Sequence, residues 1–251
     1  MDDTLALLLE LYSPLPRHGP GSLATTLRAL RLLPPLEAGS RIVDLGCGDG
    51  THSLVLLEHT PAQVVAIDLL APFIETANAR FAERGWSSRA RGVVADMGKL
   101  PAELGRFDLA WCESAIYNLG FADGLRAIQG MLSPGGHAVV TEICWNQPVA
   151  EAPAKCQELW AKEYPGMLTL DACRGHIALA GFELLASFTQ PESDWWDDYY
   201  TPLEARLPPF LAAHPGEPDA QALVDGAKLE LACRREHKES YDYFVFVLRC
   251  P

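Results

Sequence analysis

The chain contains 251 residues, which is enough for one large α/β domain with a substantial buried core. It carries 33 acidic and 20 basic residues, a formal net charge of −13, which argues against general nucleic-acid binding and against a surface that rests on anionic lipid. Its seven cysteines include no Cys-x-x-Cys pair, so we expect reduced thiols in a cytoplasmic protein and no metal site.

The first 35 residues are predicted to form two helices joined by a polar loop. Leucines recur at helical spacing over residues 4–12 and 22–33, and Pro34-Pro35 ends the second segment. The loop Arg17–Ser22 combines two glycines, a proline, a cation and an imidazole, which is typical of a mobile loop that closes over a filled site. The N-terminus has no basic signal region, and no apolar run approaches the roughly 20 residues of a membrane span, so we expect no membrane association.

From residue 41 to residue 142, short apolar strands alternate with helices. The predicted strands are Arg41–Leu45, Gln63–Ile67, Arg91–Ala95, Phe107–Cys112 and His137–Glu142. Helices are predicted up to about residue 59, at about 71–84 and at about 122–132. This alternation is typical of an open parallel sheet that is covered by helices on both faces.

After residue 143 the alternation ends. The predicted elements are helices at 151–164, 170–180 and 219–237 and strands at Phe182–Thr189 and Tyr243–Arg249. The aromatic and acidic stretch from Trp195 to Tyr200 receives no assignment. Because no linker separates a second domain, we predict one domain over residues 1–251. It would consist of an N-terminal helical lid at 1–35, a binding core at 41–142, and substrate-side helices and last strands at 143–251.

The central motif is a glycine-rich loop that follows the first predicted strand. Gly46, Gly48 and Gly50 come directly after Val43-Asp44-Leu45 and before a helix. Glycine suits a tight turn at which a ligand approaches the backbone without a Cβ in between. The spacing Gly-x-Gly-x-Gly differs from the dinucleotide fingerprint Gly-x-Gly-x-x-Gly/Ala. Thr51 and Ser53 occupy the positions where that fingerprint has glycine or alanine. The loop therefore favours a ligand without a pyrophosphate.

Two acidic residues follow the next two predicted strands. Asp68 ends the second strand, 20 residues after Gly48, where a carboxylate can accept both hydroxyls of a ribose. Asp96 and Met97 follow the third strand, where they could bind the amino group and the ring of adenine. The alternatives are a solvated turn residue for Asp68 and a helix N-cap for Asp96.

The motifs together resemble those of the class I, Rossmann-like S-adenosylmethionine (SAM)-dependent methyltransferases. The matching segments are Asp44–Gly50, Ile67-Asp68, Ala95–Met97, Phe107–Leu109 and Leu132–Gly136. The resemblance implies a three-layer α/β fold with a mostly parallel seven-stranded sheet, in which the antiparallel last strand is Tyr243–Arg249. The segments Arg17–Ser22, Glu113–Phe121 and Trp195–Pro202 resemble a bacterial subgroup of small-molecule methyltransferases.

The resemblance also implies which residues bind the cofactor SAM. Gly46 and Gly48 would contact it through the backbone, and Asp68 would bind the ribose. Asp96 and Met97 would bind the adenine. The remaining candidates for binding SAM, near its methionine end, are Asp44, Glu113 and Arg17. Asp44 would also order the glycine loop from beneath.

Methyl transfer is an in-line displacement that needs alignment and exclusion of water more than a catalytic triad or a metal. A general base is needed only if the acceptor is protonated at working pH. The candidate catalytic residues are Tyr117, as a substrate or sulfonium contact, and His18, as a ligand or base. Ordinary packing for Tyr117 and a solvated loop position for His18 are the alternatives.

Further candidates for lining the acceptor pocket follow the later strands or lie in the aromatic stretch. They are Asn118, Glu142, Trp145, Trp195, Trp196, Tyr199 and Tyr200. The four aromatic residues would form a wall over a cationic or ring-bearing acceptor, or a hydrophobic cap on the sheet. We expect a monomer or homodimer that methylates a small molecule. A non-enzymatic SAM-binding or scaffold protein is the main alternative.

Overall fold

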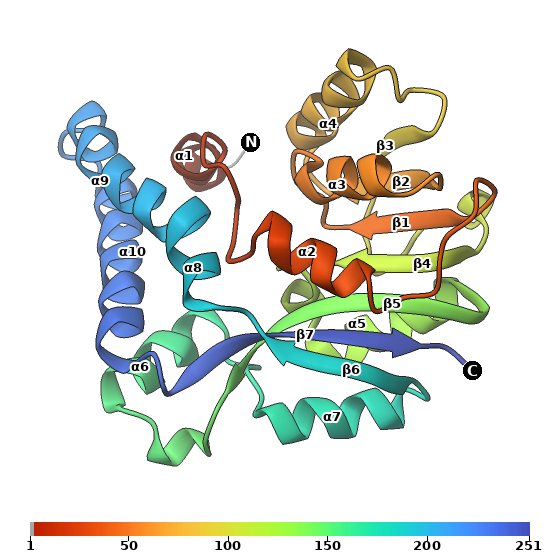
Figure 1. Cartoon of the computed structure of the whole chain (residues 1–251). Helices are drawn as coiled ribbons and strands as arrows, with labels where there is room; N and C mark the ends of the chain where they lie inside the picture. Colours follow the sequence, from red (N-terminus) through yellow and green to blue (C-terminus); the bar gives the residue numbers. More distant parts are fainter. Residues whose placement is uncertain (1–2) are drawn as a thin grey trace. The chain divides into compact units, whose positions relative to one another are not determined.

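The computed structural model describes residues 3–251, and the backbone forms two compact units (Figure 1). We call one the sheet unit; it comprises Leu23–Cys144, Gly166–Thr189 and Tyr243–Pro251. We call the other the helical unit; it comprises the chain up to Ser22, Trp145–Pro165 and Gln190–Asp242. The expectation of a single domain over residues 1–251, with its three regions, stays a prediction.

A seven-stranded sheet runs in the order β3-β2-β1-β4-β5-β7-β6. Its strands are β1 (Arg41–Leu45), β2 (Gln63–Asp68), β3 (Ala90–Val94), β4 (Phe107–Cys112), β5 (Leu132–Trp145), β6 (Glu183–Thr189) and β7 (Tyr241–Arg249). The pairs β1–β2, β2–β3, β1–β4 and β4–β5 are parallel, whereas β6 and β7 are antiparallel. The predicted mostly parallel sheet with an antiparallel last strand is confirmed.

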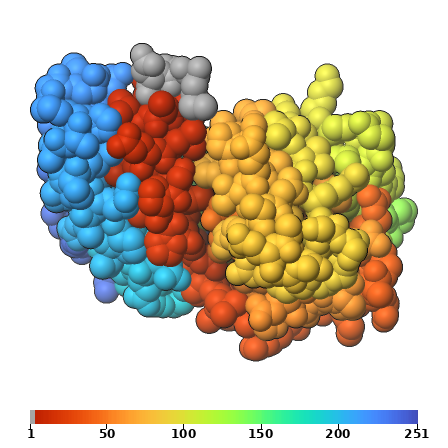
Figure 2. Space-filling view, turned by 90° about the horizontal axis from the view of Figure 1, so that it is seen from above, coloured from red at the N-terminus to blue at the C-terminus, as the bar shows by residue number. Residues whose placement is uncertain are grey.

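Helices cover both faces of the sheet, which gives three layers (Figure 1). Successive residues of a strand point to opposite faces, so Ile42 packs with one group of helices and Val43 with the other. On the Ile42 face lie α2 (Leu23–Leu30), α3 (Thr51–His59) and α4 (Ala71–Glu83). On the Val43 face lie α5 (Phe121–Met131) and α7 (Leu170–Leu179). The space-filling view shows the part from α3 to α4, coloured orange to yellow, as a continuous surface (Figure 2).

The helical unit is built on a long helix. This is α10 (Pro218–His237), which contacts α1 (Asp3–Tyr12), α6 (Ala154–Glu163) and α9 (Thr201–Ala213). The aromatic stretch is helical, with α8 (Glu192–Trp195) followed by a π-helical turn at Trp196–Tyr200. Its side chains Trp195 and Tyr200 are completely buried. In the described part of the chain, no helix combines the length and apolar character needed to cross a membrane.

Two elements differ from the sequence-based expectation. The fifth strand was predicted as His137–Glu142, but it extends over Leu132–Trp145 and includes Pro134, Gly135 and Gly136. Helix α9 was not predicted, because Pro208 and Pro209 lie inside it and a proline normally interrupts helical hydrogen bonding. The other predicted strands and helices are present with boundaries shifted by a few residues.

The guanidinium of Arg234 ties together the core of the helical unit. It binds Glu192 at 2.9 Å and Asp242 at 2.8 Å, and it lies 4.0 Å from the ring centroid of Trp195. Only 2% of its side chain is exposed. Replacing Arg234 with alanine leaves these carboxylates without their cation, so we expect a loss of about 3 kcal/mol in the free energy of unfolding, measured by urea denaturation.

The neighbouring Arg235 provides the matched control. Its ion pair with Glu204 has both side chains about half exposed, so Arg235→Ala should cost less than about 1 kcal/mol. Equal losses for the two variants would contradict the structural role assigned to Arg234.

Candidate functional site

The glycine loop joins β1 to α3 within five residues. Gly46, Gly48 and Gly50 have φ values of +66°, +53° and +84°, in the left-handed region that favours glycine. A Cβ at position 46 would lie only 2.4 Å from the Cβ of Ala115. The backbone N–H of Cys47 donates to the carbonyl oxygen of Ile67 at 2.9 Å, which fixes the loop against the end of β2. The loop is therefore a preformed concave stretch of backbone.

Asp68, at the end of β2, binds this loop directly. Its Oδ2 accepts a hydrogen bond from the N–H of Gly48 at 2.9 Å, and its Oδ1 accepts one from the N–H of Leu70 at 2.9 Å. The carboxylate is half-buried. The structure thus brings together the loop and the first of the predicted acidic partners.

Asp96 and Met97 follow β3. Asp96 Oδ1 accepts a hydrogen bond from the N–H of Gly98 at 2.8 Å, which forms a local turn, and no α-helix begins there. The sulfur of Met97 lies 3.7 Å from the position that a Cβ at Gly46 would take. Met97 therefore lies beside the glycine loop, as the sequence led us to expect of an adenine contact, although that role remains a prediction.

Beneath the loop lies a buried acidic cluster. Asp44 on β1 is 1% exposed and accepts a hydrogen bond from the hydroxyl of Ser53 at 2.6 Å. Glu113, directly after β4, is 4% exposed, and its Oε1 lies 3.2 Å from Nε2 of His52. The other oxygen of Glu113 accepts hydrogen bonds from Trp111 Nε1 at 3.0 Å and Thr26 Oγ1 at 3.3 Å. Both carboxylates are thus held by side chains of the surrounding elements.

Burial raises the pKa of Asp44 to about 6, and the charge of Glu113 adds to the rise, while His52 and the hydrogen bond from Ser53 oppose it. In the unfolded chain the carboxyl has its ordinary pKa of 3.8. Between these two values the folded protein keeps the proton that the unfolded chain has lost. The contribution of Asp44 to stability is therefore greatest at low pH and decreases as the pH rises from about 4 to about 6.

Comparing the wild type with Asp44→Asn tests this linkage, because the amide does not ionise. We expect the free energy of unfolding of the variant, relative to that of the wild type, to rise by about 2 kcal/mol between pH 4 and pH 7. Urea denaturation at several pH values measures it. Asp123→Asn, at an exposed carboxylate, is the control and should show no such trend. A wild-type-to-Asp44→Asn difference that does not change with pH would contradict the buried, proton-retaining Asp44.

The segment after β4 contains the candidate catalytic residue Tyr117. Ser114 has a φ of +56°, and no other non-glycine residue within residues 3–251 has a positive φ. Its N–H donates to Thr141 Oγ1 at 2.7 Å. Tyr117, on the 3₁₀ helix Ile116–Leu119, is 40% exposed. Asn118 Nδ2 donates to the carbonyl oxygen of Ala115, which stabilises the turn itself. The catalytic role of Tyr117 stays a prediction.

The candidate residues Arg17 and His18 belong to the helical unit. Arg17 is 7% exposed, and Pro20 and Gly21 are also buried. His18 Nε2 lies 3.4 Å from the carbonyl oxygen of Ser13, and the N–H of Gly21 donates to the carbonyl oxygen of Asp194. Local hydrogen bonds and burial hold the segment in this structure, and its predicted role as a mobile lid stays a prediction. The proposed roles of Arg17 and His18 toward cofactor or acceptor remain predictions.

The expected aromatic wall is largely used for packing. Trp195 and Tyr200 are fully buried. Arg234 lies 4.0 Å from the ring centroid of Trp195, and Arg235 lies 4.7 Å from that of Trp196. The chain's own guanidinium groups therefore cover a face of each tryptophan, where one of the two alternatives from the sequence placed a cationic acceptor. Glu142 on β5 is 1% exposed, and Trp145 packs edge-on against Tyr241 with centroids 6.1 Å apart.

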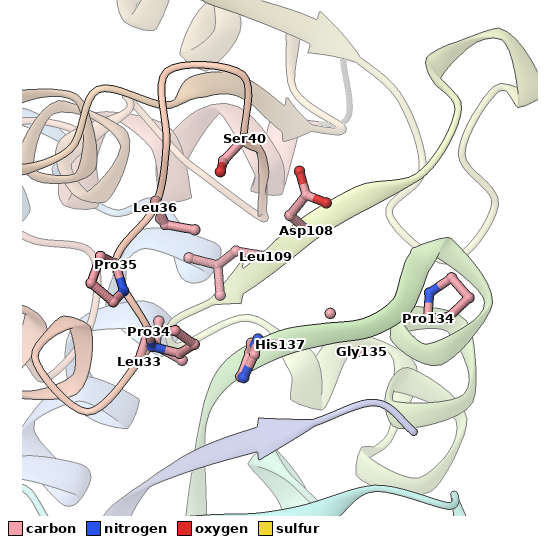
Figure 3. Close-up of a pocket in the computed structure, with 11 residues that line it drawn as sticks. Leu33, Pro34, Pro35, Leu36, Ser40, Asp108, Leu109, Pro134, Gly135 and His137 are labelled. Atoms are coloured by element: carbon pink, nitrogen blue, oxygen red, sulfur yellow. The ribbon is translucent and has the colours of Figure 1, made fainter.

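A cavity of about 230 Å³ lies at the end of the strands opposite to the glycine loop (Figure 3). Leu36, Ser40, Asp108, Leu109 and His137 are among its lining residues, next to the amino ends of β1 and β4. Ligands of open α/β sheets bind at the carboxyl ends of the strands, where the glycine loop lies. We therefore do not assign this cavity to the functional site. In the described part of the chain, no group of three or more His, Cys, Asp or Glu side chains is arranged to hold a metal ion.

Sequence reasoning missed His52, Trp111 and Thr26. The alternation of β4 does place Trp111 and Glu113 on the same face, since they are two residues apart. No spacing in the sequence indicates that residues 26, 52 and 113 meet, because the contact arises from the packing of α2 and α3 on the sheet.

Comparison with known proteins is consistent with this site. Residues 42–136 match the family model of a methyltransferase domain. The chain is 27% identical over 152 residues to 27-O-demethylrifamycin SV methyltransferase of Amycolatopsis mediterranei, a match that covers 59% of this chain and 56% of that protein. It is 28% identical over 230 residues to the protein YjhP of Escherichia coli, which covers 90% of this chain and 89% of YjhP.

Among solved structures, a SAM-dependent methyltransferase from Geobacter sulfurreducens in complex with S-adenosyl-L-homocysteine has a TM-score of 0.80, with 22% identity and 98% of each chain covered. The chain spans about half the length of the first curated relatives that it matches. It contains a methyltransferase domain with the three-layer fold described above. Residues 42–136 thus match a methyltransferase domain, and the fold is that of the class I, Rossmann-like SAM-dependent methyltransferases.

Proposed function

We propose that this protein transfers a methyl group from SAM to a small-molecule acceptor. The observation that carries the proposal is the hydrogen bond between Gly48 and Asp68, which joins the glycine loop to a half-buried carboxylate at the carboxyl end of the sheet. Loop backbone and carboxylate are the two features that a ligand with a ribose and no pyrophosphate requires at this place.

The residues at the loop fit SAM. Gly46 and Gly48 would present backbone to the cofactor, and any Cβ at Gly46 is excluded by Ala115. Asp68 would accept the ribose hydroxyls, and Asp96 and Met97 would bind the adenine. Met97 already lies beside Gly46, which supports this assignment. Arg17, Asp44 and Glu113 complete the proposed cofactor-binding set at the methionine end.

When bound, SAM supplies an electrophilic methyl group attached to a sulfonium sulfur. The sulfur leaves readily, as the thioether of S-adenosylhomocysteine. The protein then has to orient the acceptor in line with that methyl group and exclude water. Tyr117, which follows β4 and is partly exposed, is the residue of the sheet unit that we propose contacts either the acceptor or the sulfonium of SAM. His18 is the proposed base where the acceptor atom carries a proton at working pH.

A small acceptor is supported by the charge of the chain and by its relatives. The net charge of −13 disfavours an RNA substrate, because nucleic-acid binding relies on Lys and Arg. The name of the Amycolatopsis relative specifies methylation of a rifamycin, which is a small molecule. The acceptor atom, whether nitrogen, oxygen, carbon or sulfur, is left open by both observations.

Asp68→Asn tests the cofactor site, because asparagine keeps an oxygen for the Gly48 N–H and loses the charge. We expect S-adenosylhomocysteine to bind about 1–2 kcal/mol more weakly, since a hydrogen bond to a charged acceptor is replaced by one to a neutral acceptor. Isothermal titration calorimetry measures the change.

Asp108→Asn is the matched control. Asp108 also accepts a hydrogen bond from a backbone N–H, that of Arg41 at 2.8 Å, but it lies near the amino ends of the strands, away from the glycine loop. Unchanged affinity of Asp68→Asn, or an equal loss in Asp108→Asn, would remove Asp68 from the ribose site.

Turnover distinguishes an enzyme from a SAM-binding or scaffold protein. Mass spectrometry of the denatured, freshly purified protein should detect SAM or S-adenosylhomocysteine. Incubation with SAM and a metabolite extract should then yield a product heavier by one methyl group, together with S-adenosylhomocysteine. Binding without any methylated product across such extracts would favour the non-enzymatic alternative.

A further inference from the structure

We propose that His52 is a positioning residue that holds the glycine loop in its cofactor-binding form through Glu113. The inference rests on the proposed function, because it concerns the same loop. His52 lies on the first turn of α3, two residues after Gly50. It contacts the carboxylate of Glu113, which directly follows β4, whereas the strand that precedes the loop is β1.

The partner of His52 is itself rigidly oriented. Oε2 of Glu113 accepts hydrogen bonds from Trp111 and Thr26, so Oε1 is directed at His52 Nε2, 3.2 Å away. The Glu113 side chain is 2% exposed, whereas that of His52 is 15% exposed. A buried carboxylate with fixed hydrogen bonds sets the orientation of the imidazole that binds it.

Two consecutive residues of α3 are anchored to two neighbouring strands. Ser53 donates to Asp44 on β1, and His52 contacts Glu113 after β4. The strands β1 and β4 are paired in parallel, with Asp44 opposite Trp111. The glycine loop begins at the end of β1 and ends at the start of α3, so these two anchors contribute to fixing the distance and angle that the loop has to span.

The charges of the cluster show why a histidine is suited to this position. The positive end of a helix dipole lies at its N-terminus, which favours acidic residues and disfavours a cation. Two buried carboxylates, Asp44 and Glu113, face the start of α3 and repel each other. The imidazole of His52 lies 3.2 Å from Oε1 of Glu113, and its proximity lowers the pKa of Asp44, against the effect of Glu113. A side chain whose partner is oriented in advance, next to a second buried carboxylate, indicates a specific role.

His52 would therefore affect the affinity for the cofactor without contacting the cofactor. If the His52–Glu113 contact is lost, the start of α3 is held less firmly against the end of β4, and the glycine loop samples other conformations more often. The apparent affinity for the cofactor then falls in proportion to the fraction of protein molecules whose loop is in the binding-competent form.

The test uses a pair of variants that differ by one methylene group. In His52→Gln the side-chain amide nitrogen reaches the position of the imidazole Nε2 and can still donate to Glu113. In His52→Asn the same amide is too short to reach it. We expect the full-length His52→Asn protein to bind S-adenosylhomocysteine about tenfold more weakly in calorimetry, and His52→Gln to bind within about twofold of the wild type.

The matched control is His59→Asn, at the exposed last turn of the same helix, which should leave affinity unchanged. Glu113→Met combined with His52→Asn should weaken binding no more than Glu113→Met alone, because removal of the carboxylate already breaks the contact that His52 makes. Melting temperatures, recorded in parallel, show that all variants compared are folded.

Three results would overturn the proposal: wild-type affinity in His52→Asn, a His52→Gln variant as weak as His52→Asn, or fully additive losses in the double variant. Failure of the wild type to bind S-adenosylhomocysteine would instead refute the proposed function.

Discussion

The turn from β1 into α3 is the constraint on which the sheet unit depends. Gly46, Gly48 and Gly50 all adopt left-handed backbone, and Ala115 leaves no room for a side chain at position 46. Left-handed glycines lose much conformational freedom on folding, so a loop of this kind needs support from outside. The support comes from carboxylates, since Asp68 binds the N–H of Gly48 and Asp44 binds Ser53 just beyond the loop.

Burying acids for this purpose has an energetic cost. Desolvation raises the pKa of Asp44, so near neutral pH the folded protein holds an ionised group that would be more favourable in water. The hydrogen bond from Ser53 and the proximity of His52 offset part of this cost. Such local conflicts between stability and geometry are expected at functional sites. The helical unit shows the other arrangement, because buried Arg234 is paired with Glu192 and Asp242 and gains backbone partners as well.

The sequence predicted the sheet more completely than it predicted the site. Strands such as Arg41–Leu45 and Phe107–Cys112 are confirmed to the residue, because apolar runs bounded by glycine and proline carry strong local signals. Helix α9 was missed because its prolines contradict the local preference, which tertiary packing overrides. The loop and Asp68 were recognisable from their spacing, whereas His52 was not.

That difference has a physical reason. Gly48 and Asp68 come from adjacent βα units, and parallel strands bring the ends of such units to one edge at fixed spacing. The contact of His52 with Glu113, and of Glu113 with Thr26, depends on how α2 and α3 pack on the sheet. Packing of that kind depends on the summed shapes of many side chains, and no short spacing records it. The burial of Arg17 could not be predicted for a related reason, since composition says nothing of the neighbours that bury it.

Asp68 connects the support of the loop to its proposed use. An ionised carboxylate offers about four lone-pair sites, two on each oxygen. The N–H groups of Gly48 and Leu70 occupy one site on each oxygen, which leaves one on each for a further donor. Asp68 can therefore hold the loop and accept two ribose hydroxyls at the same time. Because a bound ligand would fix the same carboxylate that fixes Gly48, occupancy of the proposed site and order in the loop would reinforce each other. Methyl transfer depends on alignment more than on acid–base chemistry, and a site that becomes more rigid as it fills meets that requirement.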